Sequence, residues 1–169
     1  MKNNKTKKKE TLDLIMKESI LSAAADALLK YGAGGFTMER VATVANIAKG
    51  TVYLYFKSKN DLLKHLIEKM KKPIWNHIIE VKESGAPVKE KFEKILFHLL
   101  SGIESNLVFA RILLRAAELD EELKKNMRKD DQSTIRIFEE ILKEGVRSKE
   151  IYLSNPAYAA KIIFASMII

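Results

Sequence analysis

This chain of 169 residues has no cysteine, only three prolines and one tryptophan. The absence of cysteine excludes disulfides, thiol redox chemistry and metal sites built on thiolates. The sequence also has no nucleophile elbow, no Gly-rich phosphate-binding loop and no H-E-x-x-H pair, and its acidic pairs lie on polar helix faces. We therefore expect no catalytic residues, no metal site and no cofactor, and hence a function other than catalysis.

Long hydrophobic runs are missing as well. The apolar stretch at residues 162–169, IIFASMII, is far shorter than the roughly 20 residues that cross a bilayer. No apolar run follows the lysines of the first ten residues, which excludes a secretory signal. The chain is therefore expected in the cytoplasm, without a membrane partner.

The hydrophobic pattern is helical along the chain, and no run alternates convincingly with period two, which predicts an all-α protein. Pro73 is expected to end or kink the helix that precedes it, because proline removes an internal hydrogen bond. Asn155 and Pro156 are typical of an N-cap followed by the first helical residue. The other helices are expected at residues 11–31, 38–45, 48–56, 59–72, 88–105, 106–119 and 120–145.

Residues 37–63 contain two short helical patterns joined by a tight turn, which is typical of a helix-turn-helix DNA reader. Thr37 is the expected N-cap of the first helix. Asn46 stands where the chain must turn, and we expect it in a left-handed conformation, which asparagine tolerates. The inward stripe of the first helix consists of Met38, Val41, Ala42 and Ala45.

The second helix should bury Val52 and Phe56 and leave an unusual face outward, with a glycine, an aromatic residue and a leucine. Gly allows close approach of a backbone, Tyr53 can donate to DNA, and Leu54 can contact a thymine methyl. We expect Tyr53 and Lys49 to face the major groove, with phosphates held by Thr37, Tyr55 and Lys59. Lys49, Lys57 and Lys59 also bracket this face as phosphate contacts. The alternative is a helical hairpin with ordinary surface lysines. The full set of candidate DNA contacts is Thr37, Arg40, Lys49, Gly50, Thr51, Tyr53, Leu54, Tyr55, Lys57 and Lys59.

Positive charge is concentrated near this motif. Of a formal net charge of +8, residues 1–60 contribute +6, from ten Lys and one Arg against five acidic residues. This distribution is typical of a nucleic-acid-binding domain. Residues 1–10 hold five Lys and no apolar residue after Met1, so we expect a disordered basic arm, which either contacts phosphates or is a solvated tail.

The motif resembles the DNA-binding domain of the TetR/AcrR family of transcriptional repressors over about residues 15–70. The match comprises Thr37, the run KGTVYLYF at residues 49–56, KSK at 57–59 and DLL at 61–63; Asn46 departs from the usual Gly. The resemblance implies a three-helix DNA-binding domain followed by a helical ligand-binding and dimerisation bundle. We accordingly divide the chain into an arm at 1–10, a DNA-binding domain at 11–57 and a second domain at 58–169, with 58–72 as connecting helix.

Bulky apolar side chains recur in the second domain, where most such residues simply fill a core. The resemblance implies a cavity among these helices for a small, often hydrophobic effector. Two histidines could be polar contacts there or ordinary half-buried residues, and Arg111 and Arg115 could hold an acidic ligand or face solvent. The candidate pocket residues are Met70, Trp75, His77, Phe97, His98, Phe109 and Phe138.

The resemblance also implies a homodimer bound to a near-palindromic operator, because one reading helix selects too few base pairs. The family usually adds one more long helix, so we expect this chain to lack the last helix of the bundle. The candidate dimer residues are Tyr158, Ile162, Phe164 and Ile169. Two hypotheses remain: a repressor released by a small ligand, and a regulator without one, whose second domain dimerises or binds a protein. An RNA-binding module is a distant third.

Overall fold

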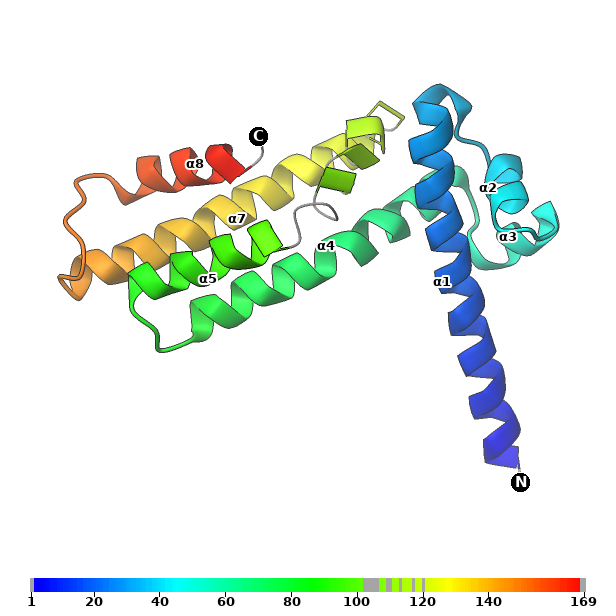
Figure 1. Ribbon diagram of the computed structural model, residues 1–169, viewed down its shortest axis with the longest axis horizontal. Coiled ribbons are helices and arrows are strands. Elements are labelled where there is room, and N and C mark those ends of the chain that lie inside the picture. Colours follow the sequence, from blue (N-terminus) through cyan, green and yellow to red (C-terminus); the bar gives the residue numbers. More distant parts are fainter. Residues whose placement is uncertain are drawn as a thin grey trace. The chain divides into compact units, whose positions relative to one another are not determined.

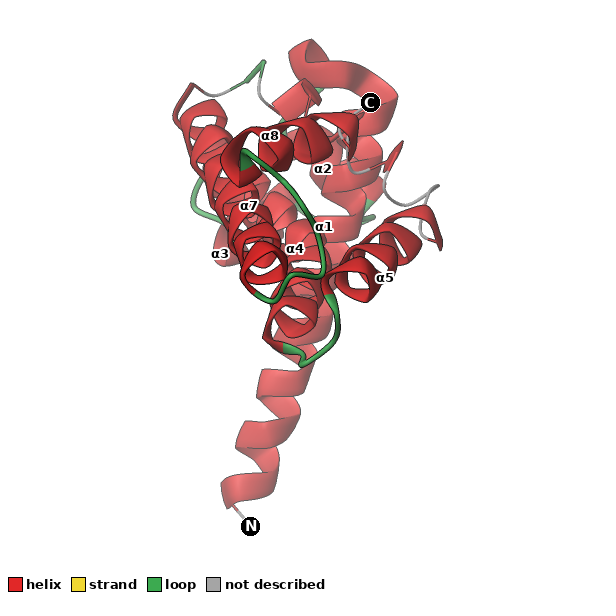
Figure 2. Cartoon of the chain, turned by 90° about the vertical axis from the view of Figure 1, so that its left-hand side faces the viewer, coloured by secondary structure: helices red, strands yellow, loops and turns green. Residues whose placement is uncertain are grey.

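A computed structural model describes residues 2–101, 107–108, 111–112, 114–116, 118–119 and 121–167. Over these residues the chain is helical and contains no strand, which confirms the all-α prediction (Figure 2). The helices in chain order are α1 (Lys2–Gly35), α2 (Met38–Val44), α3 (Lys49–Tyr55), α4 (Lys59–Glu83), α5 (Val88–Ser101), α7 (Glu121–Arg147) and α8 (Pro156–Met167).

The chain forms two compact units. Unit 1 comprises Met1–Lys69 together with Arg111–Asp120, and unit 2 comprises Met70–Ala110 and Glu121–Ile169. This division differs from the expected one in two respects. Unit 1 extends past residue 57 to include the first part of α4, and it takes in a segment that lies in sequence between two helices of unit 2.

Unit 1 is built on α1, α2, α3 and the start of α4, whose apolar stripes meet in one small core (Figure 1). Phe36, in the connection between α1 and α2, is 2% exposed and fills this core as a plug. The other fully buried side chains of the core include Ile20, Ala24, Leu28, Val41, Val52, Phe56, Leu62 and Leu63. Of the inward stripe predicted for residues 38–45, Met38, Val41 and Ala42 are buried and Ala45 is half-buried.

Helix α1 is longer than the sequence predicted. In place of a disordered arm, the residues from Lys2 onward continue α1, and this part extends beyond α2 and α3 (Figure 1). No glycine or proline precedes Gly32, and lysine is a good helix former, so nothing local interrupts the helix. The helical path breaks at Gly32, whose φ of 68° and ψ of −177° are open to glycine at little cost.

Of the two outcomes expected at Pro73, an end or a kink of the helix, the end does not occur. The helix runs from Lys59 to Glu83 with Pro73 inside it. A proline in this position cannot donate to the carbonyl of Lys69, so α4 loses one internal hydrogen bond where the chain passes from unit 1 into unit 2. Burial of Ile78 and Val81 on the following turns stabilises the helix beyond the proline.

Unit 2 consists of the second part of α4 with α5, α7 and α8, which lie alongside one another (Figures 1 and 2). Its core cluster is apolar, and the ring of the half-buried Phe92 meets that of the buried Phe138 edge to face, with centroids 5.7 Å apart. The start of α8 is capped as predicted, because the Asn155 side chain accepts a hydrogen bond of 3.0 Å from Tyr158 N. Among the described helices none is long and apolar enough to cross a membrane.

Candidate nucleic-acid interface

The first helix of the motif is capped by Thr37. This residue has extended backbone angles, φ −134° and ψ 155°, and its hydroxyl oxygen accepts a hydrogen bond of 3.2 Å from Arg40 N. The turn that follows α2 places Asn46 at φ 54°, in the left-handed region. Both local predictions are confirmed, so the departure from the usual glycine leaves the turn intact.

Helix α3 has the two faces that its sequence predicts. Val52 and Phe56 are both fully buried, whereas Tyr53 is 46% and Leu54 83% exposed. A Cβ atom added at Gly50 would meet no atom within 4 Å. The fold of unit 1 therefore requires neither an aromatic residue, nor a leucine, nor a glycine on the outward face of α3.

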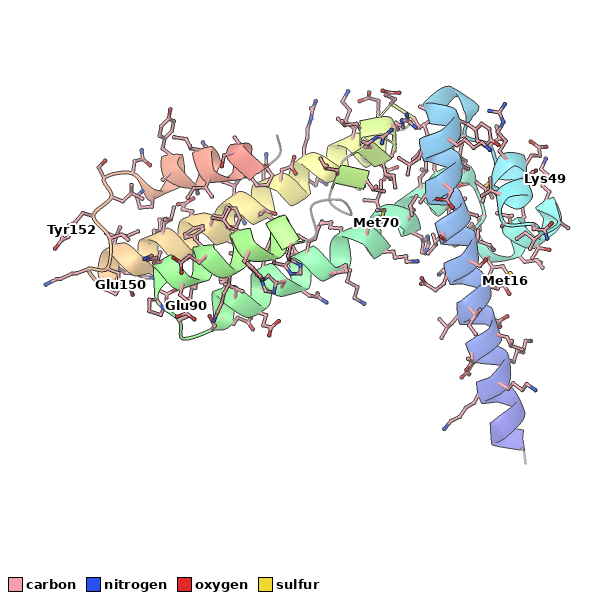
Figure 3. All side chains as sticks on the ribbon, viewed as in Figure 1. Met16, Lys49, Met70, Glu90, Glu150 and Tyr152 are labelled. Carbon is pink, nitrogen blue, oxygen red and sulfur yellow. The ribbon has the colours of Figure 1, made fainter. Side chains whose placement is uncertain are left out.

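Lys49, the first residue of α3, carries an acidic partner. Its ammonium group forms a salt bridge with Glu39 of α2, and both side chains are about half exposed (Figure 3). The hydrogen bond with Glu39 raises the pKa of Lys49 above its ordinary value. Glu39 was not among the residues that the sequence pointed to, because a lone exposed acid carries no helical pattern.

Arg40 connects α2 to the end of α1. Its Nη1 donates to the carbonyl of Gly35 at 2.7 Å, and its guanidinium lies over the Tyr31 ring, 4.7 Å from the centroid. A Cβ at Gly35 would lie 2.8 Å from Tyr31 Cβ and would also clash with Arg40, so glycine is required for this close approach. In the free protein Arg40 thus orients α2, whether or not it also contacts DNA.

Tyr55 is similarly engaged within the unit. Its hydroxyl donates to Asp13 of α1 at 3.1 Å, and partial burial, with Asp13 next, raises its pKa. Beside it, the Lys17 ammonium lies 5.6 Å from the centroid of the Phe56 ring. These contacts join α3 to α1 and give Tyr55 a role in positioning α3.

The start of α4 is fixed by a reciprocal cap. Ser58 Oγ accepts from Asp61 N at 3.1 Å, while Asp61 Oδ2 accepts from Lys57 N at 2.8 Å. One backbone donor of the first turn, Asp61 N, and one just before the helix, Lys57 N, are thereby satisfied. Lys57 is exposed and Lys59 half-buried on this turn.

Thr51 is half-buried in α3. Of the candidate lysines, Lys49 and Lys57 are exposed and Lys59 is half-buried. Accessible ammonium groups of this kind are suited to contact with a polyanion. Within the described part of the chain, no group of three or more His, Asp or Glu could hold a metal ion.

A contact that the sequence did not reveal involves Arg115. Its Nη1 donates to the carbonyl of Leu28 at 2.7 Å and also to that of Leu29, near the end of the helical path of α1. Ile112 and Ala116, one turn apart in the same segment, are fully buried. The glycines after Tyr31 were the available signal for the Arg115 contact, because a helix that ends there leaves carbonyls in need of donors.

The candidate pocket residues occupy different settings in unit 2. Phe138 is fully buried in the core, whereas Phe97 is 74% exposed. His77 and His98 stack with ring centroids 4.1 Å apart, and His77 Nε2 lies 3.3 Å from the carbonyl of Lys94. Burial, and then the neighbouring His77, lower the pKa of His98 from its ordinary 6.5.

Met70 and Trp75 are half-buried, with the Lys71 ammonium 5.3 Å from the centroid of the Trp75 ring. Figure 3 marks Met70 on α4. Phe109 lies outside the described residues.

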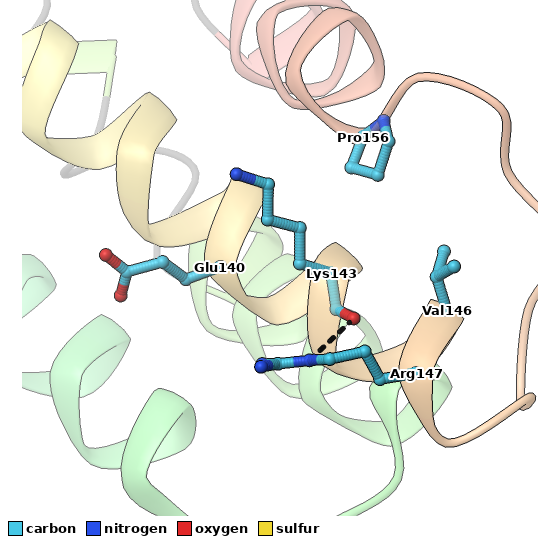
Figure 4. A pocket seen from close by; sticks show the side chains of 5 residues that line it. All are labelled: Glu140, Lys143, Val146, Arg147 and Pro156. Carbon is cyan, nitrogen blue, oxygen red and sulfur yellow. Dashed lines mark hydrogen bonds between the residues drawn. The ribbon is translucent and has the colours of Figure 1, made fainter.

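A pocket of about 270 Å³ lies at α7 and the start of α8 (Figure 4). None of the candidate pocket residues lines it. Its cationic groups have partners: Lys143 pairs with Glu139 at 2.6 Å, and Arg147 Nε donates to the Lys143 carbonyl at 3.3 Å. The lining residues are Glu140, Lys143, Val146, Arg147 and Pro156.

Three of the candidate dimer residues, Tyr158, Ile162 and Phe164, lie on α8. Tyr158 is 64% and Ile162 53% exposed, so this helix presents an apolar side to its surroundings. Phe164 is partly buried against the core cluster of unit 2, and Ile169 lies outside the described residues.

The motif at residues 37–63 lies within a segment that matches a known protein family. Residues 20–66 match the family model described as "Bacterial regulatory proteins, tetR family". The fatty acid metabolism regulator protein of Bacillus subtilis (strain 168) is 33% identical over 136 residues, covering 78% of this chain and 69% of that protein. The uncharacterized HTH-type transcriptional regulator YhgD of the same organism is 26% identical over 148 residues, covering 87% of this chain and 78% of that protein.

Among solved structures, the transcriptional regulator FadR from Bacillus subtilis in complex with stearoyl-CoA is 29% identical. The TM-score is 0.70, and the match covers 89% of this chain and 82% of that chain. The matched family and these relatives are regulators of transcription and not enzymes, in agreement with the absence of catalytic motifs.

Proposed function

This chain belongs to the TetR family of regulatory proteins, and we propose that it is a dimeric repressor released from a near-palindromic operator by a small hydrophobic ligand. The observation that carries the DNA-binding part is the outward face of α3. That face exposes Leu54, Tyr53 and the open side of Gly50, although the unit itself requires none of them. A partner that approaches α3 closely accounts for all three features.

Gly50→Ala tests this assignment, because stability and function should move in opposite directions. Alanine inside a helix is favoured over glycine by roughly 1 kcal/mol, and its Cβ meets no atom of the protein, so the melting temperature should rise. The operator is first identified by selection from random DNA. The affinity of Gly50→Ala for it should be lower than that of wild type, because the added Cβ occupies the space of the DNA backbone or a base. Gly85→Ala, also in open space but in unit 2, should leave affinity unchanged. Undiminished binding by Gly50→Ala would remove α3 from the interface.

Phosphate contacts and base contacts can be distinguished by how their substitution changes the dependence of DNA affinity on salt and on sequence. Lys59→Ala should weaken binding to every duplex and lower the salt slope by about one, as expected for a phosphate contact. Tyr53→Ala should instead change the preference among sequences. A change of specificity in Lys59→Ala, with none in Tyr53→Ala, would contradict the assignment of these two residues.

Dimerisation is proposed because two reading heads are needed to select a genomic site. The exposed side of α8, with Tyr158 and Ile162, is the candidate interface and resembles the apolar centre of an obligate contact. Sedimentation of the protein at concentrations that saturate the operator should show a dimer. A monomer under those conditions would exclude this mode of recognition.

The effector class follows from the relatives. A similar structure holds stearoyl-CoA, and a 33% identical relative is named a fatty acid metabolism regulator, so we propose a long-chain acyl thioester of coenzyme A. Helix α4 passes from unit 1 into unit 2 and lacks the hydrogen bond at Pro73, which makes it a suitable element to transmit a change. The ligand must bind the DNA-incompetent state more tightly, since equal affinity would shift nothing.

Reciprocity supplies the test. Operator DNA must weaken stearoyl-CoA binding by the same factor by which stearoyl-CoA weakens operator binding. Calorimetric titration of stearoyl-CoA with and without operator measures that factor. Equal affinities in the two titrations would exclude induction by this ligand. Equal affinities for acyl-CoA ligands of other chain lengths as well would favour the second candidate, a regulator without a small ligand. The full burial of Phe138 in the core of unit 2 also supports that candidate.

A further inference from the structure

The salt bridge between Glu39 and Lys49 lies on the side of unit 1 that carries the candidate DNA contacts. The Glu39 side chain is 63% and the Lys49 side chain 49% exposed, so both can exchange partners freely. Glu39 lies at the start of α2, next to Met38 and Arg40, and Lys49 opens α3. The structure thus brings an acidic group to a surface that should meet a polyanion.

The packing of the fold does not require this carboxylate, whose charge in the first turn of α2 adds only a favourable interaction with the helix dipole. The inner side of α2 is formed by Met38, Val41 and Ala42, and Glu39 contributes to the helix through its backbone, where its carbonyl accepts a hydrogen bond of 2.9 Å from Thr43 Oγ1. An exposed ion pair stabilises a protein little. The neighbouring Arg40 cannot substitute for Lys49 as the partner, because its guanidinium is bound to the Gly35 carbonyl and stacked on Tyr31.

The electrostatic consequence for DNA binding is unfavourable. A carboxylate that contacts Lys49 lies within one Debye length of any phosphate that Lys49 could approach, about 8 Å at physiological salt. Glu39 therefore repels the DNA backbone and competes with it for the ammonium group of Lys49. In the free protein the positive charge of Lys49 is therefore balanced locally by Glu39.

We propose that Glu39 is an electrostatic brake on DNA binding: it neutralises Lys49 in the free protein and is exchanged for DNA when the complex forms. This inference rests on the proposed DNA-binding function and adds a residue that limits affinity for all duplexes alike. Such a limit reduces the time spent on non-specific DNA, which competes with the operator in large excess.

The test compares Glu39→Gln with wild type on the operator and on a scrambled duplex of equal length, at salt concentrations from 50 to 200 mM. Glutamine keeps the size and a hydrogen-bond acceptor but removes the charge. Affinity should rise about fivefold on both duplexes at the lowest salt, and the salt slope should steepen by up to about 0.9. Lys49→Gln should reduce affinity more in the Glu39→Gln background than in wild type, because there the ammonium is free to contact DNA.

The matched control is Glu18→Gln, which removes the same charge from another exposed pair of unit 1, with Lys69. It should change affinity less than twofold, and the melting temperatures of both variants should equal that of wild type. Unchanged affinity in Glu39→Gln, or an equal gain in Glu18→Gln, would overturn the brake. A change confined to the operator would show that Glu39 reads a base instead. Failure of wild type to bind any duplex would refute DNA binding itself, and the brake with it.

Discussion

The buried ammonium of Lys91 leads to an asymmetric stability prediction. Lys91 of α5 is 1% exposed, and its Nζ donates to both carboxylate oxygens of Glu144 on α7, at 2.9 and 3.0 Å. The Glu144 side chain, by contrast, is 50% exposed. The cost of breaking the pair should therefore depend on which partner is removed.

Removal of Glu144 leaves a buried ammonium without its counter-charge. Breaking a buried pair in this way costs about 3 to 5 kcal/mol, and we expect the lower end because Glu150 is close enough to interact with Lys91. In Lys91→Met the buried charge itself disappears, and water can solvate the half-exposed Glu144. That substitution should change the free energy of unfolding by less than about 1 kcal/mol, since apolar replacement of buried charges is often neutral.

Thermal and urea denaturation followed by circular dichroism measure both variants. For a chain of this size, about 3 kcal/mol corresponds to a decrease in melting temperature of roughly 6 to 12 °C for Glu144→Ala. Glu93→Ala breaks the fully external pair with Lys89, whose side chains are 85% and 61% exposed, and should cost less than about 0.5 kcal/mol. A larger loss in Lys91→Met than in Glu144→Ala would refute the reasoning from solvation.

Three further predictions concern other contacts. Arg115→Ala should lower the melting temperature of the protein, because two carbonyls of α1 lose their donor, whereas the exposed Arg111→Ala should not; equal effects would show that net charge is responsible. Gly145→Ala should destabilise by about 1 to 2 kcal/mol in urea, since its Cβ would lie 2.6 Å from Val88 Cγ2, and a gain in stability would contradict this packing. The lowered pKa of His98 means that the unfolded chain binds this proton first as pH falls, so stability present above pH 6.5 should be lost on acidification; His98→Gln should flatten this part of the pH–stability curve.

Features that depend on neighbours in sequence were predictable from the sequence alone. The Thr37 cap, the left-handed Asn46, the inward Val52 and Phe56 and the Asn155 cap all follow from interactions within one or two helical turns. Periodicity also identified the all-α class, because a 3.6-residue repeat of apolar side chains directly encodes a buried helix face. The expected disordered arm was wrong, and at Pro73 the helix does not end. The helical preference of the flanking residues outweighed the clustered lysines at the start of α1 and the proline inside α4.

The tertiary structure decided which polar groups are already engaged. Tyr55 is bound to Asp13, 42 residues away, and Lys91 to Glu144, 53 residues away. Arg115 joins α1 across 87 residues and so brings a segment from between two helices of unit 2 into unit 1. A helical pattern shows only which side of a helix is polar, and each of these side chains is polar in any case. Their partners are fixed by how the apolar faces pack. Only the tertiary structure therefore shows which groups Tyr55, Arg115 and Glu39 contact.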